Sequence, residues 1–148
     1  MKRGKAQVSL EYLILLSVAL ALIIAAMTVF FVYSKNSTSS VTKSRIAEIG
    51  NEVVYNAESL YGIGDGSRVI LETNFPEEIQ EVYVLDGVEL VMVIRTPQGI
   101  SESLFFSKVQ LNGTSARPAG GQYIGAISPG KNFIRIESKG DYILLNAS

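Results

Sequence analysis

The chain has 148 residues, of which 47% are hydrophobic, and its formal net charge is −1. This length allows one compact domain plus an accessory element. The absence of Cys and His excludes disulfides, thiolate and imidazole metal ligands, and every catalytic arrangement built on a Ser–His or Cys–His pair. After residue 6 the chain is acidic and shows no cluster of Lys and Arg, so we expect no nucleic-acid partner.

A long apolar segment lies near the N-terminus. From Tyr12 to Tyr33 every residue is apolar or aromatic except Ser17 and Thr28. A helix of this length rises about 33 Å, close to the ~30 Å hydrocarbon core of a bilayer. The segment exceeds the ~7–15 apolar residues of a cleaved secretory signal, and a chain this small has no core wide enough to surround such a helix. The segment therefore predicts a membrane-spanning helix, in which both hydroxyls can donate to carbonyls one turn earlier.

The residues before this segment form a recognisable pattern. Residues 1–6 are a short basic leader, MKRGKA, and residues 7–13 read QVSLEYL. This pattern resembles the class III signal peptide of archaeal type IV pilin precursors, in which Q-x-S-x-E-Y-L follows a basic stretch ending in a small residue. The resemblance covers about the first 35 residues. It implies a non-enzymatic structural subunit of a type IV pilus-like surface filament that serves adhesion, without cofactor or metal.

The resemblance also implies roles for individual residues. A prepilin peptidase is expected to cut between Ala6 and Gln7 on the cytoplasmic side of the membrane. Gln7 then becomes the first residue and Glu11 the fifth, and Ser9 and Tyr12 belong to the same assembly motif. The further implied partners are other copies of the chain, a pilus assembly ATPase and its membrane platform. The precursor would reside in the membrane and the mature chain in an extracellular filament.

Glu11 is the acidic residue that lies directly against the apolar segment. Gln7 and Glu11 are four residues apart and share one face of a helix. After cleavage the α-amine of Gln7 is positive near neutral pH, and an unpaired charge is strongly disfavoured in an apolar interior. We expect Glu11 to pair with this amine in its own chain or in a neighbour, which would set the register between subunits. If Gln7 cyclises to a neutral lactam, Glu11 would instead accept hydrogen bonds from N–H groups at the helix N-terminus.

The middle of the chain changes from apolar to one-sided. Residues 35–40, KNSTSS, are poor helix formers and predict either a linker or a weakly helical continuation. An amphipathic helix is expected beyond them, because apolar residues recur at spacings of three and four up to about residue 62. The apolar positions are Ile46, Ile49, Val53, Ala57 and Leu60. The acidic residues expected on its wet side are Glu48, Glu52 and Glu58.

From residue 67 onward the apolar period becomes two, which predicts six or seven short antiparallel strands. Asp86-Gly87 between two such runs predicts a two-residue hairpin turn. Residues 113–130 are rich in Gly and Pro and predict a long loop or an irregular pair of edge strands. The predicted fold class is α+β, with a long N-terminal helix packed on a small C-terminal antiparallel β-sheet head. A sandwich arrangement of the strands is also compatible with the pattern.

These elements divide the chain into four segments. They are the leader at 1–6, the transmembrane or filament-core helix at 7–34, the amphipathic helix or linker at 35–62, and the β-rich extracellular head at 67–148.

Three N-x-[ST] sequons begin at Asn36, Asn112 and Asn146. Such a motif is an acceptor of N-linked glycans only where it is exposed on an exported protein. The pilin resemblance makes export, and therefore glycosylation, an expectation. Asn112 is the best candidate because it is expected in a loop, whereas Asn146 lies at the end of the sequence.

Other functions remain compatible with the sequence. A minor pilin or tip adhesin would bind a ligand through residues 113–130, and a plain membrane-anchored surface protein would keep residues 1–6. An exported enzyme would have to use carboxylates such as those of Glu77, Glu78 and Glu81. These three flank a proline and have the pattern of a solvated surface run, so we expect no enzymatic activity.

Overall fold

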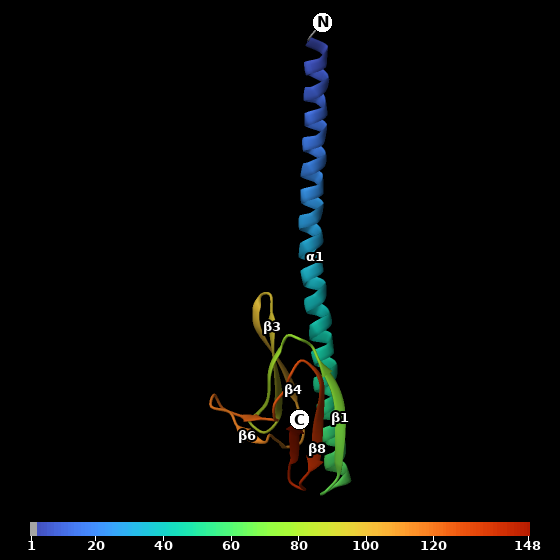
Figure 1. Ribbon diagram of the computed structural model, residues 1–148. Coiled ribbons are helices and arrows are strands. Elements are labelled where there is room, and N and C mark those ends of the chain that lie inside the picture. The colour runs from blue at the N-terminus through green and yellow to red at the C-terminus, as the bar shows by residue number, and fades with distance from the viewer. Residues whose placement is uncertain (1–2) are drawn as a thin grey trace. The chain divides into compact units, whose positions relative to one another are not determined.

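The computed structural model describes residues 3–148, except for the side chains of residues 3–9 and 35–39 (Figure 1). The chain forms two compact units, residues 1–38 and residues 39–148. One helix, α1 (Arg3–Ile63), continues from the first unit into the second. The fold is α+β, as predicted.

Residues 35–40 are helical, which decides between the two structures expected for them. Ser, Thr and Asn each cost only about 0.5 kcal/mol relative to Ala in a helix interior. Helix formation is cooperative, so a stretch of poor helix formers without Pro or Gly stays helical when stable helical segments flank it on both sides. The polar residues 35–40 therefore do not end α1.

The amphipathic pattern of the second unit is confirmed. All five predicted apolar positions of α1, from Ile46 to Leu60, are buried. Glu48 and Glu52 are exposed as expected. Glu58 differs, because it is half-buried and its Oε1 accepts the backbone N–H of Lys108 at 2.9 Å. Glu58 therefore binds the helix to a loop of the head at Lys108 and does not only face water.

Nine strands follow the helix and form two sheets. Their bounds are β1 Arg68–Phe75, β2 Ile79–Leu85, β3 Glu89–Thr96, β4 Gly99–Phe106, β5 Leu111–Asn112, β6 Ser115–Ala116, β7 Gln122–Tyr123, β8 Gly130–Ser138 and β9 Ile143–Ala147. The first sheet has the order β1-β8-β9-β5 and the second has the order β4-β3-β2-β7-β6.

The strand prediction needs two corrections. The structure has more strands than expected because β5, β6 and β7 contain two residues each, too few to produce a period in the sequence. The head is also not wholly antiparallel, since β5 and β9 pair in parallel, with Leu111 opposite Ile143. That pair joins segments far apart along the chain, and no local pattern marks it.

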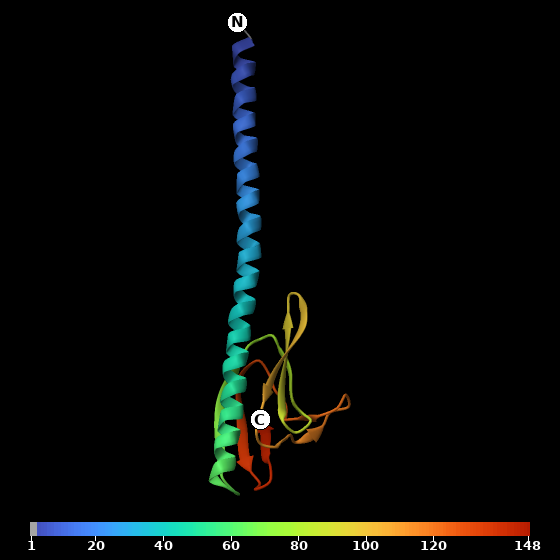
Figure 2. The ribbon, with the colours of Figure 1, turned by 180° about the vertical axis from the view of Figure 1, so that it is seen from behind.

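One hydrophobic core joins the helix and both sheets. The buried side of α1 contributes Val53, the first sheet contributes residues such as Ile134, and the second sheet contributes residues such as Met92. In Figure 1 the strands β1 and β8 lie in front of the C-terminal part of α1, and in Figure 2, seen from behind, the helix lies in front of them. The helix therefore covers one face of the first sheet and leaves its other face open to solvent.

The turn between β2 and β3 contains three residues, because the last pair of the ladder is Leu85 with Glu89. The sequence predicted a two-residue turn. Asp86 and Gly87 both adopt positive φ angles, of 50° and 73°, and Val88 donates its N–H to the carbonyl of Leu85. Asp and Gly tolerate this left-handed region, so the prediction of their conformation is right and only the loop length is wrong.

Gly50 lies where α1 meets β4. A Cβ atom at this position would come within 2.3 Å of the Phe105 ring. Although Gly is a poor helix former, we expect Gly50→Val to lower the free energy of unfolding by ~1–3 kcal/mol through overpacking. Urea unfolding of the detergent-solubilised full chain, followed by circular dichroism, measures this. Ala47→Val, at an exposed position of the same helix, is the matched control. Equal stability of the two variants would contradict the expectation.

Candidate functional site

The apolar part of α1 is the first candidate site. It extends from Leu10 to Ser34, and its 25 residues are long and apolar enough to cross a membrane. None of its side chains is buried within the chain itself, and Leu15 and Val29 are each 70% exposed. Burial of a large apolar side chain contributes about 1.5–3 kcal/mol. The segment therefore requires an apolar environment, and it can anchor the chain in a membrane.

The hydroxyl groups of Ser17 and Thr28, which lie in the middle of this segment, are satisfied by the helix itself. Ser17 Oγ donates to the carbonyl of Leu13 at 2.8 Å, and Thr28 Oγ1 donates to the carbonyl of Ile24 at 2.9 Å. This confirms the predicted back-bonding. These two hydroxyls in the middle of the segment can therefore enter an apolar environment without an unsatisfied donor.

The predicted processing and assembly residues lie at the N-terminal end of α1. The side chains of Ala6, Gln7 and Ser9 are outside the described part of the structure, although the helical backbone includes all three. Glu11 and Tyr12 are exposed, and Glu11 forms no ion pair with the residues that the structure describes. The Glu11 carboxylate is exposed, and α1 places the backbone of Glu11 one turn after that of Gln7.

The structure also locates two of the three sequons. Asn112 belongs to β5, so its expected position in a loop is wrong, and its side chain is half-buried. Asn146 belongs to β9, lies opposite Arg135 and is half-buried as well. The side chain of Asn36 is outside those described. A two-residue strand such as β5 leaves no signal in the sequence, which explains the misplacement of Asn112.

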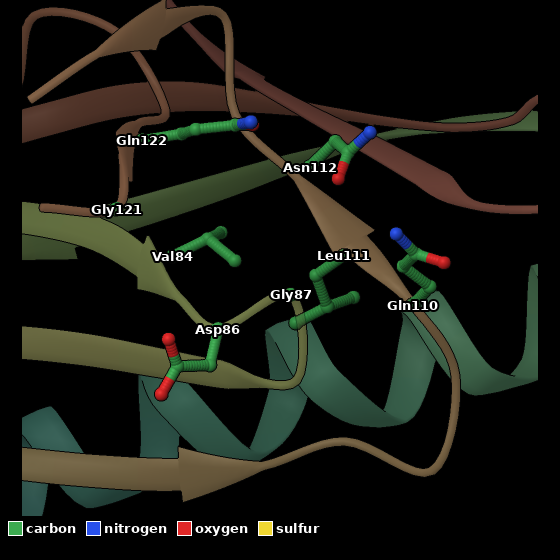
Figure 3. Close-up of a pocket in the computed structure, with 8 residues that line it drawn as sticks. All are labelled: Val84, Asp86, Gly87, Gln110, Leu111, Asn112, Gly121 and Gln122. Carbon is green, nitrogen blue, oxygen red and sulfur yellow. The ribbon is translucent and has the colours of Figure 1, made fainter.

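A polar pocket in the head is the second candidate site (Figure 3). Its volume is about 320 Å³, and it lies between the β2–β3 turn, β5 and the start of β7. The lining residues are Val84, Asp86, Gly87, Gln110, Leu111, Asn112, Gly121 and Gln122. Three side-chain amides therefore lie around one cavity, whereas the carboxylate of Asp86 points away from them in Figure 3.

Most of these polar groups have no partner in the described part of the chain. Gln122 Oε1 accepts the backbone N–H of Gly113 at 2.7 Å, which holds the amide in place and leaves its NH₂ group unused. The side chains of Gln110, Asn112 and Asp86 form no hydrogen bond with any described residue. Each amide offers both donors and an acceptor. The pocket can therefore bind a neutral ligand rich in hydroxyl groups, which also donate and accept.

The three carboxylates named for the enzyme alternative differ in their surroundings. Glu81 Oε2 lies 3.1 Å from the guanidinium of Arg117 in an ion pair. Glu77 is exposed and Glu78 is half-buried, and none of the three lines the pocket of Figure 3. Arg117 in turn stacks on the ring of Tyr83, with its Cζ 4.1 Å from the ring centroid.

The chain matches no protein-family model, no curated protein and no solved structure. The assignment of function therefore depends on the chemistry of the residues themselves.

Proposed function

We propose that the chain is the precursor of a structural subunit of a type IV pilus-like archaeal surface filament. The observation that carries this proposal is the order of three features along the sequence: the basic leader at residues 1–6, the QVSLEYL motif at residues 7–13, and an exposed apolar segment ending at Ser34. A plain membrane anchor needs the third feature only. The first two are those on which a prepilin peptidase would act.

Cleavage after Ala6 changes the electrostatics of the helix end. The leader contains three basic residues, Lys2, Arg3 and Lys5, and these charges favour the cytoplasmic side of the membrane. Their removal leaves the α-amine of Gln7 and the carboxylate of Glu11, which can neutralise each other. The mature helix therefore costs less to draw out of the bilayer than the precursor helix does.

Polymerisation supplies the apolar environment that the bilayer supplied before. The side chains of Leu10–Ser34 would pack against the same segment of neighbouring copies. The hydrophobic effect does not oppose this transfer, because lipid tails and packed helices are similarly apolar. The polar head stays in water. The carboxylate of Glu11 forms an ion pair with the α-amine of a neighbouring copy. Adhesion to surfaces is the role that we assign to the filament, with the peptidase, an assembly ATPase and a membrane platform as its partners.

Cell fractionation tests the proposal. Filaments sheared from cells that produce the full chain are expected to contain it as an abundant component, while a smaller precursor pool stays in the membrane fraction. Detection with an antibody against residues 67–148 follows both pools. A chain found only in the membrane fraction, with none in the sheared material, would favour the uncleaved surface protein.

The polar pocket favours a second candidate function, that of a minor subunit or tip adhesin. Its unused amides would recognise hydroxyl groups of a neutral carbohydrate. Isotope-labelled full chain in detergent micelles, titrated with glucose, galactose and N-acetylglucosamine, tests this. We expect saturable shifts of the side-chain amide signals of Asn112 and Gln122 with at least one sugar. Asn112→Leu should abolish the shift of the Gln122 amide, and Asn51→Leu, on the exposed face of α1, should not. The absence of shifts with every sugar would remove this candidate.

A further inference from the structure

The outer face of the first sheet combines apolar and basic groups. In β1 and β8 the outward side chains include four residues that we call the basic face: Arg68, Ile70, Phe133 and Arg135. Ile70 is 59% exposed and Phe133 is 41% exposed. Neither arginine has a salt bridge with the described residues. Phe133 contacts Lys131, whose Nζ lies 5.4 Å from the centroid of the ring, and otherwise the face is exposed.

The remaining charges of this face are already paired. Lys131 Nζ lies 2.9 Å from Glu72 Oε1, and Lys139 Nζ lies 2.6 Å from Glu137 Oε1. The hydrogen bond from Lys139 lowers the pKa of Glu137, with smaller contributions from the nearby arginines. The two charges within each ion pair cancel, so the net charge of the face is that of its two arginines without a salt bridge.

The outer face of the second sheet has the opposite surplus. In β3 and β4 the outward side chains include five residues that we call the acidic face: Glu89, Ile100, Glu102, Leu104 and Phe106. Ile100 is 73% exposed and Phe106 is 68% exposed. Glu89 lies opposite Phe106 in the ladder. Neither glutamate has a salt bridge with the described residues.

The other charges near the acidic face leave this surplus in place. Glu81 and Arg117 form an ion pair. Arg95 at the end of β3 lies 3.5 Å from the amide oxygen of Gln80. The positive charge of Arg95 offsets the negative charge of one of the two glutamates, so the acidic face retains a net negative charge. Burial raises the pKa of Tyr83 beneath this face, and the charge of Glu102 raises it further.

We propose that the basic face of one copy of this chain binds the acidic face of the next copy, in a lateral contact between heads. This inference rests on the proposed function and names a second interface of the same filament. Exposed apolar side chains mark interaction surfaces when they gather in one patch. Here each patch carries charges of one sign, and the two signs are complementary.

A second copy fits these faces better than other partners do. An anionic membrane surface would attract Arg68 and Arg135 but would leave the acidic face with its exposed apolar residues uncovered. Two different faces that bind each other form a heterologous contact, which propagates as an open assembly when the rotation between copies does not close. Such an arrangement suits a filament, because every copy presents one free face of each kind until the next copy is added.

Charge reversal with rescue tests the contact in cells that produce the full chain. The basic-face variant is Arg68→Glu/Arg135→Glu, and the acidic-face variant is Glu89→Arg/Glu102→Arg. Each is expected to lower the yield of sheared filaments at least ~10-fold, because like charges then oppose each other across the interface. The variant with all four changes restores complementarity and is expected to recover most of the wild-type yield.

Controls separate assembly from folding. Glu77→Arg reverses an exposed charge that belongs to neither face and should leave the yield unchanged. Each variant in the membrane fraction should resist trypsin in its head as the wild type does, which identifies a variant that fails to fold. The proposal is overturned if both single-face variants assemble normally, or if the fourfold variant is as defective as they are. If the contact is overturned but wild-type filaments contain the chain, the proposed function is still supported.

The contact also makes a prediction about modification. Asn146 lies opposite Arg135 on the outer face of the first sheet. A glycan on Asn146 would cover the basic face, so chains taken from filaments should be unmodified at this residue. A complete glycan on Asn146 in filament-derived protein would contradict the proposed contact.

Discussion

Glu11→Leu is expected to lower the amount of the chain in sheared filaments at least ~10-fold while cleavage after Ala6 continues. Removal of one partner from a buried charge pair costs ~3–5 kcal/mol, because the other charge stays buried and unpaired. The α-amine of Gln7 is that other charge in the proposed filament. Quantitative mass spectrometry of sheared and membrane fractions measures both the yield and the N-terminus of each pool.

Two further variants define the cause of the Glu11 effect. Glu11→Gln keeps the size and removes the charge, and we expect a defect nearly as large as that of Glu11→Leu. Glu48→Leu changes an exposed glutamate of the same helix in the second unit, and we expect normal yield. Wild-type yield of Glu11→Leu filaments would mean that the carboxylate has no part in assembly.

Gly125→Ala is expected to destabilise the head by ~3–5 kcal/mol, from backbone strain and a steric clash together. Gly125 has a φ angle of +130°, and a Cβ there would lie 2.3 Å from the carbonyl oxygen of Ala147. That carbonyl belongs to the backbone of β9, where Ala147 also donates its N–H to the carbonyl of Ile124 at 2.6 Å. The strand therefore cannot move aside cheaply.

Gly120→Ala is the matched control for this effect. Gly120 also has a positive φ, of +98°, but a Cβ there would meet no atom within 4 Å. Its cost should be the strain alone, ~1–2 kcal/mol. Urea unfolding of the detergent-solubilised full chain compares both variants with wild type. Equal midpoints for the two variants would show that β9 yields to the added methyl group.

The parts of the fold that could be predicted are the segments in which apolar residues recur at a regular spacing over many residues. Ile46, Val53 and Leu60 recur at helical spacing, and all are buried as predicted. Leu90 and Met92 alternate with the residues between them and face the core shared with α1. In such segments burial of one face decides the structure, and this burial pattern is present in the sequence itself.

The parts that could not be predicted depend on contacts between distant segments. Asn112 acquires its strand only because β5 pairs with β9, more than thirty residues later in the chain. Gln122 reaches the same pocket because β7 pairs with β2, where it lies opposite Val84. Neither pairing has a local signature, so the pocket of Figure 3 could not be assembled from the sequence. The N-terminal motif needs no such contacts, because its residues follow one another directly.

The most direct test of the central claim is the exact mass of the N-terminal peptide of this chain in filaments sheared from native cells. The proposed function predicts that the peptide begins at Gln7, as the free amine or as its lactam, and that this form is abundant. A chain that still begins at Met1 and occurs only in the membrane fraction would contradict the account and identify an anchored surface protein instead.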